Sequence, residues 1–217
     1  MSELDIEIYN EAPLGEGAVY VLLGDEKPEK VLSGLEKVRS RAAYVFIRGF
    51  DWNRDLSPWP GKAVFKNSPD FAGKADDFLG EITEEVIPFV NGKLKEKPCY
   101  HAIAGYSLAG LFAVYSLYKT PCFSRAVTAS GSLWYGGFKD FALSSPFAGK
   151  PEKVYFSLGD REKRTKNKDM ARVEESTRKI YEYFKGLGLE TTFELNLGNH
   201  FQDPEGRLAK GIGWIID

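Results

Sequence analysis

The chain has 217 residues, 43% of them hydrophobic, and its formal net charge is −2 at pH 7. This length suits one domain around a buried sheet and is short for two, while the near-neutral charge gives no electrostatic reason to expect a nucleic-acid partner. Two cysteines provide no disulfide framework, and residues 1–5 lack the basic and apolar regions of a signal peptide. Because no apolar run approaches the ~18 residues of a membrane span, we expect a cytoplasmic protein without a membrane partner.

Predicted strands and helices alternate along the chain. The pattern predicts an edge strand at 6–8, a strand at 18–23, a helix over 28–38, a strand at 43–48, a long loop over 49–75, a helix over 76–90, a strand at 99–104, a helix over 111–118, strands at 126–130 and 154–158, a helix over 169–187, a strand at 191–197 and a short C-terminal helix. The apolar stripe of the helix over 76–90 includes Phe89, and Asn91 and Gly92 are expected to end that helix. Such alternation indicates an α/β protein with a mostly parallel sheet and helices on both faces, in a single domain over residues 1–217.

A serine stands at the corner between the predicted strand at 99–104 and the helix that follows it. The sequence of residues 105–110 is Gly-Tyr-Ser-Leu-Ala-Gly, with Ser107 in the middle. This is close to G-x-S-x-G, the nucleophile elbow of α/β-hydrolases, in which small flanking residues make room for a strained serine. Ala109 occupies the second small position and Gly110 follows. An alternative is that Ser107 caps the helix while the glycines allow close packing.

A nucleophilic serine needs a base, and the chain contains two histidines, His101 and His200. His101 precedes Ser107 by six residues on the predicted strand, so at ~3.3 Å per residue it lies toward the opposite end and is expected to be a packed core residue. His200 follows the strand at 191–197, near the C-terminus. The chain order of α/β-hydrolases is serine, acid, histidine. We therefore predict His200 as the base for Ser107.

Two carboxylates follow the strand at 153–158, in Gly159-Asp160-Arg161-Glu162. In a serine hydrolase the acid holds the imidazole in one tautomer and stabilises the imidazolium as it forms. Glu162 is far enough into the loop to turn back toward His200, whereas Asp160 is shorter and closer to the strand end. We predict Glu162 as the acid, with Asp160 as the alternative. This charged run is also compatible with a solvated surface loop.

The loop after the strand at 43–48 is long and rich in aromatic residues, as expected of a loop that builds a site at the carboxyl edge of a sheet. In the hydrolase arrangement one oxyanion-hole N–H comes from this loop and the other from the residue after the nucleophile. These positions predict the N–H groups of Phe50 and Leu108 as the donors, since Gly49 lets the chain turn close to the substrate.

Three aromatic residues, Trp52, Trp134 and Tyr135, are candidates to wall a small substrate pocket. For Trp52 and Trp134 a plug over the core is an equally good interpretation. No cysteine and histidine cluster has the spacing of a zinc site. We therefore expect neither a metal nor another cofactor.

Four segments together resemble the esterase D / enterochelin-esterase-like branch of the α/β-hydrolase superfamily. They are Gly-Tyr-Ser-Leu-Ala-Gly at 105–110, Ser-Gly-Ser-Leu-Trp-Tyr at 130–135, Gly-Asp-Arg-Glu at 159–162 and Gly-Asn-His-Phe at 198–201. The resemblance implies an α/β-hydrolase fold without a large lid and a serine esterase that acts on small or siderophore-like carboxylic esters. It implies Ser107 as nucleophile, His200 as base and an acid on the 159–162 loop, although some relatives work with a serine–histidine dyad. Acyl transfer by the same residues, or a non-catalytic binding protein on this fold, stays open, as does the oligomeric state.

Overall fold

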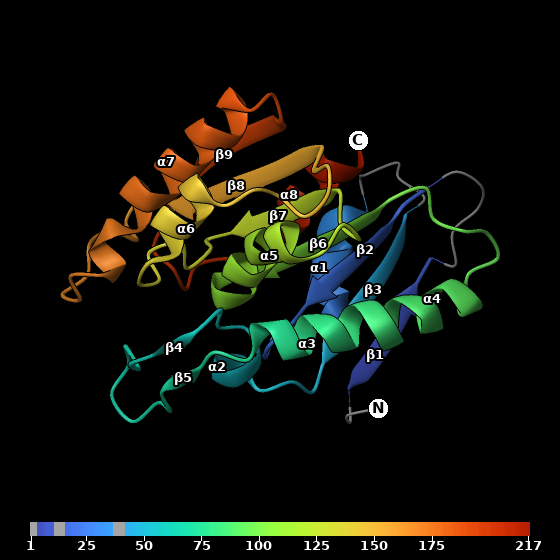
Figure 1. Ribbon diagram of the computed structural model, residues 1–217, viewed down its shortest axis with the longest axis horizontal. Coiled ribbons are helices and arrows are strands. Elements are labelled where there is room, and N and C mark those ends of the chain that lie inside the picture. Colours follow the sequence, from blue (N-terminus) through green and yellow to red (C-terminus); the bar gives the residue numbers. More distant parts are fainter. Residues whose placement is uncertain (1–3, 11–15, 37–41) are drawn as a thin grey trace.

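A seven-stranded sheet forms the centre of the protein (Figure 1). The computed structural model describes residues 4–10, 16–36 and 42–217. The strand order is β1-β3-β2-β6-β7-β8-β9, and every neighbouring pair is parallel except β1 with β3. The strands are β1 (Asp5–Tyr9), β2 (Ala18–Leu22), β3 (Ala43–Arg48), β6 (His101–Tyr106), β7 (Arg125–Ala129), β8 (Lys153–Gly159) and β9 (Glu190–Asn196). The prediction of a mostly parallel sheet is confirmed.

Helices cover both faces of this sheet, which is why its central strands are apolar throughout rather than alternating. On one face lie α3 (Ala75–Glu81), α4 (Ile87–Lys93), α5 (Ser107–Lys119), α6 (Phe138–Ser144) and α7 (Val173–Gly186), and on the other lie α1 (Pro28–Leu35) and α8 (Pro204–Ile216). Successive residues of β2 divide between the two cores: Tyr20 belongs to the core that includes α5, and Val21 belongs to the core that includes α1 and α8. No helix in the described ranges has the length and apolarity needed to cross a lipid bilayer.

The helix predicted over 76–90 differs from expectation in its middle and at its end. A π-helical turn, Ile82–Val86, joins α3 to α4, and α4 continues to Lys93 rather than ending at Asn91 and Gly92. A π turn closes hydrogen bonds over five residues instead of four, so it rotates everything after it about the helix axis. Ile87 and Val90 consequently face the core, and Phe89 is 41% exposed. Its predicted place on the buried stripe is wrong.

Other boundaries also shift. The strand before Ser107 occupies His101–Tyr106 rather than 99–104, and α5 begins at Ser107 itself. The stretch before β8 contains α6, and the C-terminal helix has 13 residues instead of being short. The long loop contains α2 (Trp52–Asp55) and an antiparallel pair, β4 (Pro60–Gly61) with β5 (Phe71–Ala72). The predicted continuation of the helix over 28–38 to residue 38 lies outside the described residues.

The carboxyl ends of the parallel strands lie along one edge of the sheet. The segments that leave β3, β6, β7, β8 and β9 therefore meet there, which is where α/β sheets build their sites. These segments carry the predicted residues Phe50, Ser107, Trp134, Glu162 and His200 in that order.

Candidate active site

Ser107 stands on a sharp corner with no residue between strand and helix. It has φ = +55°, a left-handed conformation that costs a non-glycine residue about 1–3 kcal/mol. A Cβ atom on Gly105 would lie 2.3 Å from the carbonyl carbon of Ala109, and one on Gly110 would lie 3.0 Å from the carbonyl oxygen of Gly105. The methyl group of Ala109 fits because Gly105, opposite to it, is bare. The helix-cap alternative for Ser107 is wrong, because Tyr106 occupies the cap position.

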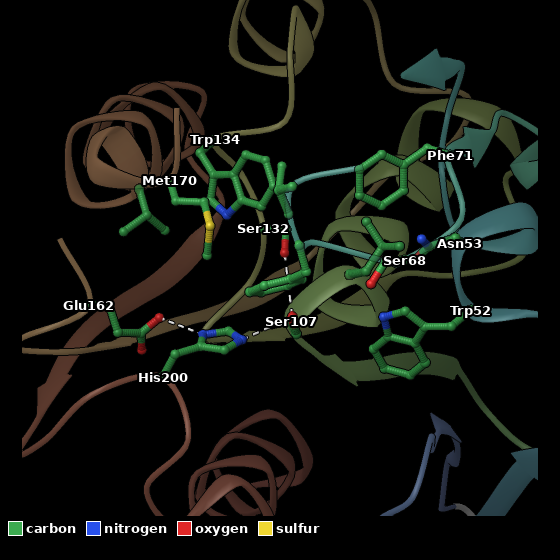
Figure 2. Close-up of a pocket in the computed structure, with 14 residues that line it drawn as sticks. Trp52, Asn53, Ser68, Phe71, Ser107, Ser132, Trp134, Glu162, Met170 and His200 are labelled. Carbon is green, nitrogen blue, oxygen red and sulfur yellow. Dashed lines mark hydrogen bonds and ion pairs between the residues drawn. The ribbon is translucent and has the colours of Figure 1, made fainter. Parts of the chain in front are cut away.

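The side chains of Ser107, His200 and Glu162 form a continuous hydrogen-bonded triad (Figure 2). His200 Nε2 lies 3.0 Å from Ser107 Oγ, and His200 Nδ1 lies 2.8 Å from Glu162 Oε2. An ionised carboxylate only accepts, so Nδ1 carries the proton of the neutral ring and Nε2 is left free to accept from the serine. This is the arrangement in which imidazole acts as a general base.

Glu162 is held at both oxygens. While Oε2 faces His200, Oε1 accepts from the Ser130 hydroxyl at 2.7 Å, from the Gly159 N–H at 2.5 Å and from Arg207 Nη1 at 3.1 Å. Its side chain is only 4% exposed, and such burial by itself favours the neutral acid. The hydrogen bond and charge of His200, with the Gly159 N–H and the Ser130 hydroxyl, outweigh this desolvation and lower the pKa of Glu162.

Asp160, the alternative acid, lies elsewhere. Its Oδ1 accepts the Gly198 N–H at 2.8 Å and lies 3.6 Å from Arg161 Nε. Gly198 has φ = +113°, a conformation open to glycine, and begins the turn that carries His200. Asp160 thus fastens the loop of His200 without touching the imidazole. A second tether comes from Tyr106, whose hydroxyl donates to the His200 carbonyl oxygen at 2.8 Å.

His101 lies at the far end of β6 from the triad, as its spacing predicts. It is the first residue of the strand, and its ring is 5.6 Å from that of Tyr20. Burial lowers the pKa of His101, which favours the neutral ring.

Of the two predicted oxyanion donors, Leu108 follows Ser107 directly and Phe50 lines a cavity that Ser107 also borders. Leu108 belongs to the first turn of α5, where backbone N–H groups have no carbonyl partner within the helix. Phe50 follows Gly49, which has φ = +86°, and both line a cavity that also contacts Ser107. The part of these N–H groups in binding an oxyanion stays a prediction.

Two cavities meet at Ser107 and His200. The smaller, of about 190 Å³, has apolar walls that include Trp52, Trp134, Leu108 and Met170. The larger, of about 580 Å³, lies on the side of Gly49 and Phe50 and reaches Asp25, Glu26 and Phe201. Trp52 and Trp134 thus lie where a pocket wall was predicted, and Trp52 borders both cavities.

Tyr135 does not line either cavity, so its prediction as a pocket wall is wrong. Its side chain is buried, its hydroxyl donates to the Trp59 carbonyl oxygen at 2.6 Å, and its ring packs edge-on against Phe71. Trp134 and Tyr135 follow each other in a turn and point in different directions, Trp134 toward the smaller cavity and Tyr135 into the core. For two adjacent aromatic residues in a loop, the sequence does not indicate which side chain faces a cavity and which enters the core.

Sequence reasoning missed the arm over residues 60–72, which projects beside α2 (Figure 1). Val64, Phe65, Ser68 and Phe71 of this arm line the smaller cavity, and Phe65 also borders the larger one. The available signal was Phe65, an aromatic residue directly before the polar run Lys-Asn-Ser at 66–68. Arg207 and Ser132 were missed as well. Ser132 Oγ lies 3.4 Å from Ser107 Oγ. Arg207 could not be distinguished in the sequence from the other charged residues of the predicted helices.

The described residues contain no group of three or more histidine, cysteine or acidic side chains that could hold a metal ion.

Comparison with known proteins gives a family. A family model described as "Putative esterase" matches residues 28–200. Uncharacterized protein YbbA of Bacillus subtilis is 26% identical over 164 residues, which are 74% of this chain and 61% of that protein. The siderophore enterobactin esterase of Emericella nidulans is 39% identical over 70 residues, 31% of this chain and 23% of that protein. The matched parts span less than two thirds of either relative's length.

Solved structures with the same fold extend over nearly the whole chain. The siderophore hydrolase EstA from Aspergillus nidulans aligns with a TM-score of 0.74 at 21% identity, over 98% of this chain and 88% of that one. An IroE-like serine hydrolase from Shewanella oneidensis gives 0.79 at 18%, over 98% and 75%. The enterobactin esterase FES from Shigella flexneri, in the presence of enterobactin, gives 0.72 at 16%, over 97% and 54%. The α/β-hydrolase fold is confirmed.

Proposed function

Since this chain belongs to that esterase family, we propose that it is a serine esterase that hydrolyses a carboxylic ester through an acyl-enzyme. The observation that carries the proposal is the continuous triad: Ser107 Oγ and Glu162 Oε2 lie 3.0 and 2.8 Å from the two nitrogens of His200. A packing role for the serine would require neither this contact nor its strained φ of +55°.

In the first half of the reaction, Ser107 Oγ attacks the ester carbonyl carbon and its proton passes to His200 Nε2. Glu162 stabilises the resulting imidazolium through Nδ1. The carbonyl oxygen becomes an oxyanion, which accepts from the Leu108 and Phe50 N–H groups, each donor contributing about 2.7–4 kcal/mol in such sites. When the carbonyl reforms, the C–O bond to the alcohol breaks, and the alcohol leaves with the proton from His200.

In the second half, water attacks the acyl-enzyme and His200 Nε2 takes its proton. The second oxyanion collapses, the bond to Ser107 Oγ breaks, and the proton returns to the serine. The products are one carboxylic acid and one alcohol.

The two cavities support a division of the substrate. Both cavities reach Ser107 and His200, so each can hold one side of the ester. We assign the acyl group to the smaller cavity and the alcohol to the larger one. The names of EstA and of the Emericella and Shigella relatives refer to siderophores or enterobactin. A small or siderophore-like ester is accordingly the substrate that we propose.

Labelling with a fluorophosphonate and turnover of p-nitrophenyl esters test the proposal together. We expect the wild-type protein to be labelled and active, and both Ser107→Ala and His200→Ala to lose most of that activity, because members of such a unit are strongly non-additive. Ser124→Ala is the matched control, since this serine precedes β7 at the opposite end of the sheet. Absence of labelling and of ester turnover would favour a binding protein. Ester formation from an added alcohol, faster than hydrolysis, would favour acyl transfer.

A further inference from the structure

Arg207 is a cation enclosed behind the triad. It lies in the first turns of α8 with a side chain only 2% exposed. Its Nη1 donates to Glu162 Oε1 at 3.1 Å, to Ser130 Oγ at 3.1 Å and to the Tyr106 hydroxyl at 3.3 Å, and its Nη2 donates to the Leu197 carbonyl oxygen at 3.0 Å. These four partners lie at or just beyond the carboxyl ends of β6, β7, β8 and β9. One guanidinium therefore joins four neighbouring strand ends.

The surrounding backbone is shaped to hold this side chain. Asp203, three residues after His200, caps α8: its side chain accepts the Gly206 N–H and its carbonyl oxygen accepts the Arg207 N–H. The helix therefore starts at a defined point, Pro204. A Cβ atom on Gly159 would lie 3.0 Å from both terminal nitrogens of Arg207 and 2.4 Å from the Gly198 carbonyl oxygen. Only bare backbone leaves the guanidinium room between the loops of Glu162 and His200.

The contacts of Arg207 help to hold both Glu162 and the loop that carries His200. With Oε1 bound to Arg207, Ser130 and Gly159, the Glu162 carboxylate is held against rotation and presents Oε2 to His200. The Tyr106 hydroxyl accepts from Arg207 and donates to the His200 carbonyl oxygen. A buried carboxylate and a buried guanidinium are each costly alone, and removing either leaves the other uncompensated.

From this geometry we propose that Arg207 is a positioning residue for the esterase reaction: it acts through Glu162 and the loop of His200 to hold the triad in its reactive arrangement. This inference rests on the proposed function. Arg207 lines neither cavity, so it acts without contact to the substrate.

The decisive variants are Arg207→Lys and Arg207→Met, alone and combined with Glu162→Gln. Lysine keeps the charge but loses the planar fork that reaches several partners at once. We expect Arg207→Lys to lower kcat by up to about 10²-fold, the effect of a displacement of about 1 Å in a catalytic group, with KM much less affected. In the Glu162→Gln background the same change should lower kcat by a clearly smaller factor. Fluorophosphonate titration corrects each rate for the concentration of folded sites.

The acid limb of the pH profile separates positioning from general stability. The titratable groups that face Glu162 are His200 from the loop after β9, Arg207 from α8 and Tyr106 from β6. Arg207 places a positive charge directly behind the Glu162–His200 pair, and a nearby cation disfavours protonation of the groups around it. The acid limb of kcat/KM should therefore move to higher pH in Arg207→Met and return toward wild type in Arg207→Lys. A role confined to stability leaves that limb in place.

Arg125→Lys is the matched control, because Arg125 is partly buried and, like Arg207, donates to a backbone carbonyl, that of Ile215 on α8, but from the opposite end of the sheet. It should keep kcat. If Arg207→Met does not fold, the kinetics of Arg207→Lys alone test the proposal.

A wild-type kcat in Arg207→Lys, or a loss of kcat that is equal in the wild-type and Glu162→Gln backgrounds, would overturn the proposal. A wild-type protein without ester turnover would instead overturn the proposed function. The low-field NMR proton between His200 Nδ1 and Glu162 then still tests the positioning, since it should be lost in Arg207→Lys and kept in Arg125→Lys.

Discussion

The methyl group of Ala109 lies so close to Gly105 that a Cβ atom added to Gly105 would come within 2.6 Å of it. The same atom would lie 2.3 Å from the Ala109 carbonyl carbon, which is backbone and does not move aside. The corner under Ser107 therefore tolerates one methyl group at position 109 on condition that position 105 has none.

We predict that Gly105→Ala forces the strand and helix apart. Overpacking of this kind typically costs about 1–3 kcal/mol of unfolding free energy, and displacement of Ser107 should lower kcat/KM as well. Gly92→Ala is the control: a Cβ there meets no atom within 4 Å, so unfolding free energy should stay the same or rise slightly. Denaturant unfolding and ester turnover measure both. Wild-type values for Gly105→Ala would contradict the packing argument.

The second prediction concerns the acid. Glu162→Gln should lower kcat/KM by about 10²-fold or more, short of the ~10⁴ seen when the carboxylate of a serine protease is replaced, because the amide offers the wrong partner to the imidazole. Asp160→Asn should be mild, since its amide oxygen can still accept the Gly198 N–H. Steady-state kinetics on one ester compares the two. A larger effect at Asp160 would transfer the role to it, and two small effects would indicate a serine–histidine dyad.

Stability in acid should depend on Glu162. Its folded-state pKa is lowered, because His200, Gly159 and Ser130 together outweigh its desolvation. Its contribution to stability is therefore present above the unfolded-state pKa of about 4.3 and is lost as the pH falls through the lower folded-state value. The difference in unfolding free energy between wild type and Glu162→Gln should accordingly be constant above about pH 5 and shrink below the unfolded-state pKa.

Denaturant unfolding over a pH series measures this difference. Glu175→Gln is the control, because Glu175 is exposed and pairs with Lys179 on the surface of α7. Its difference from wild type should stay small at every pH. A Glu162→Gln difference that grew in acid would contradict the sign of the shift.

The fourth prediction concerns the acyl group. The smaller cavity holds about 190 Å³, so acetyl, butanoyl and aromatic esters should react faster than long-chain esters. Phe65 borders both cavities and is 52% exposed. Phe65→Ala should join the cavities and raise kcat/KM for longer acyl groups relative to acetyl, with little loss of stability.

A series of p-nitrophenyl esters of rising chain length measures that ratio. Phe89→Ala is the control, because Phe89 is 41% exposed on α4 and lines neither cavity. Faster wild-type turnover of dodecanoyl than of acetyl and butanoyl esters would contradict the assignment of the small cavity. If the ratio changed equally in Phe65→Ala and Phe89→Ala, Phe65 would have no specific part in selecting the acyl group.

Much of the architecture could be predicted because it follows from local patterns. Apolar runs such as residues 43–48 and 153–158 predict buried strands, and their alternation with helices predicts a parallel sheet. The π turn at Ile82–Val86 was missed, although Pro88 directly after it has no N–H to donate and so marks an interruption of the regular α-helical hydrogen bonds. Its rotation of the following helix turned Phe89 outward against the expected stripe.

For the candidate site, the sequence by itself determined which residue types were available and in which order they follow the strands. Ser107, an acid on the 159–162 loop and His200 could be named because chain order and strand ends are local properties. Only the tertiary structure decided that Glu162 rather than Asp160 meets His200, that Tyr135 turns into the core, and that Arg207 lies behind the carboxylate. Those outcomes depend on loop conformation and on contacts between segments far apart in the chain. No local pattern of residues encodes them.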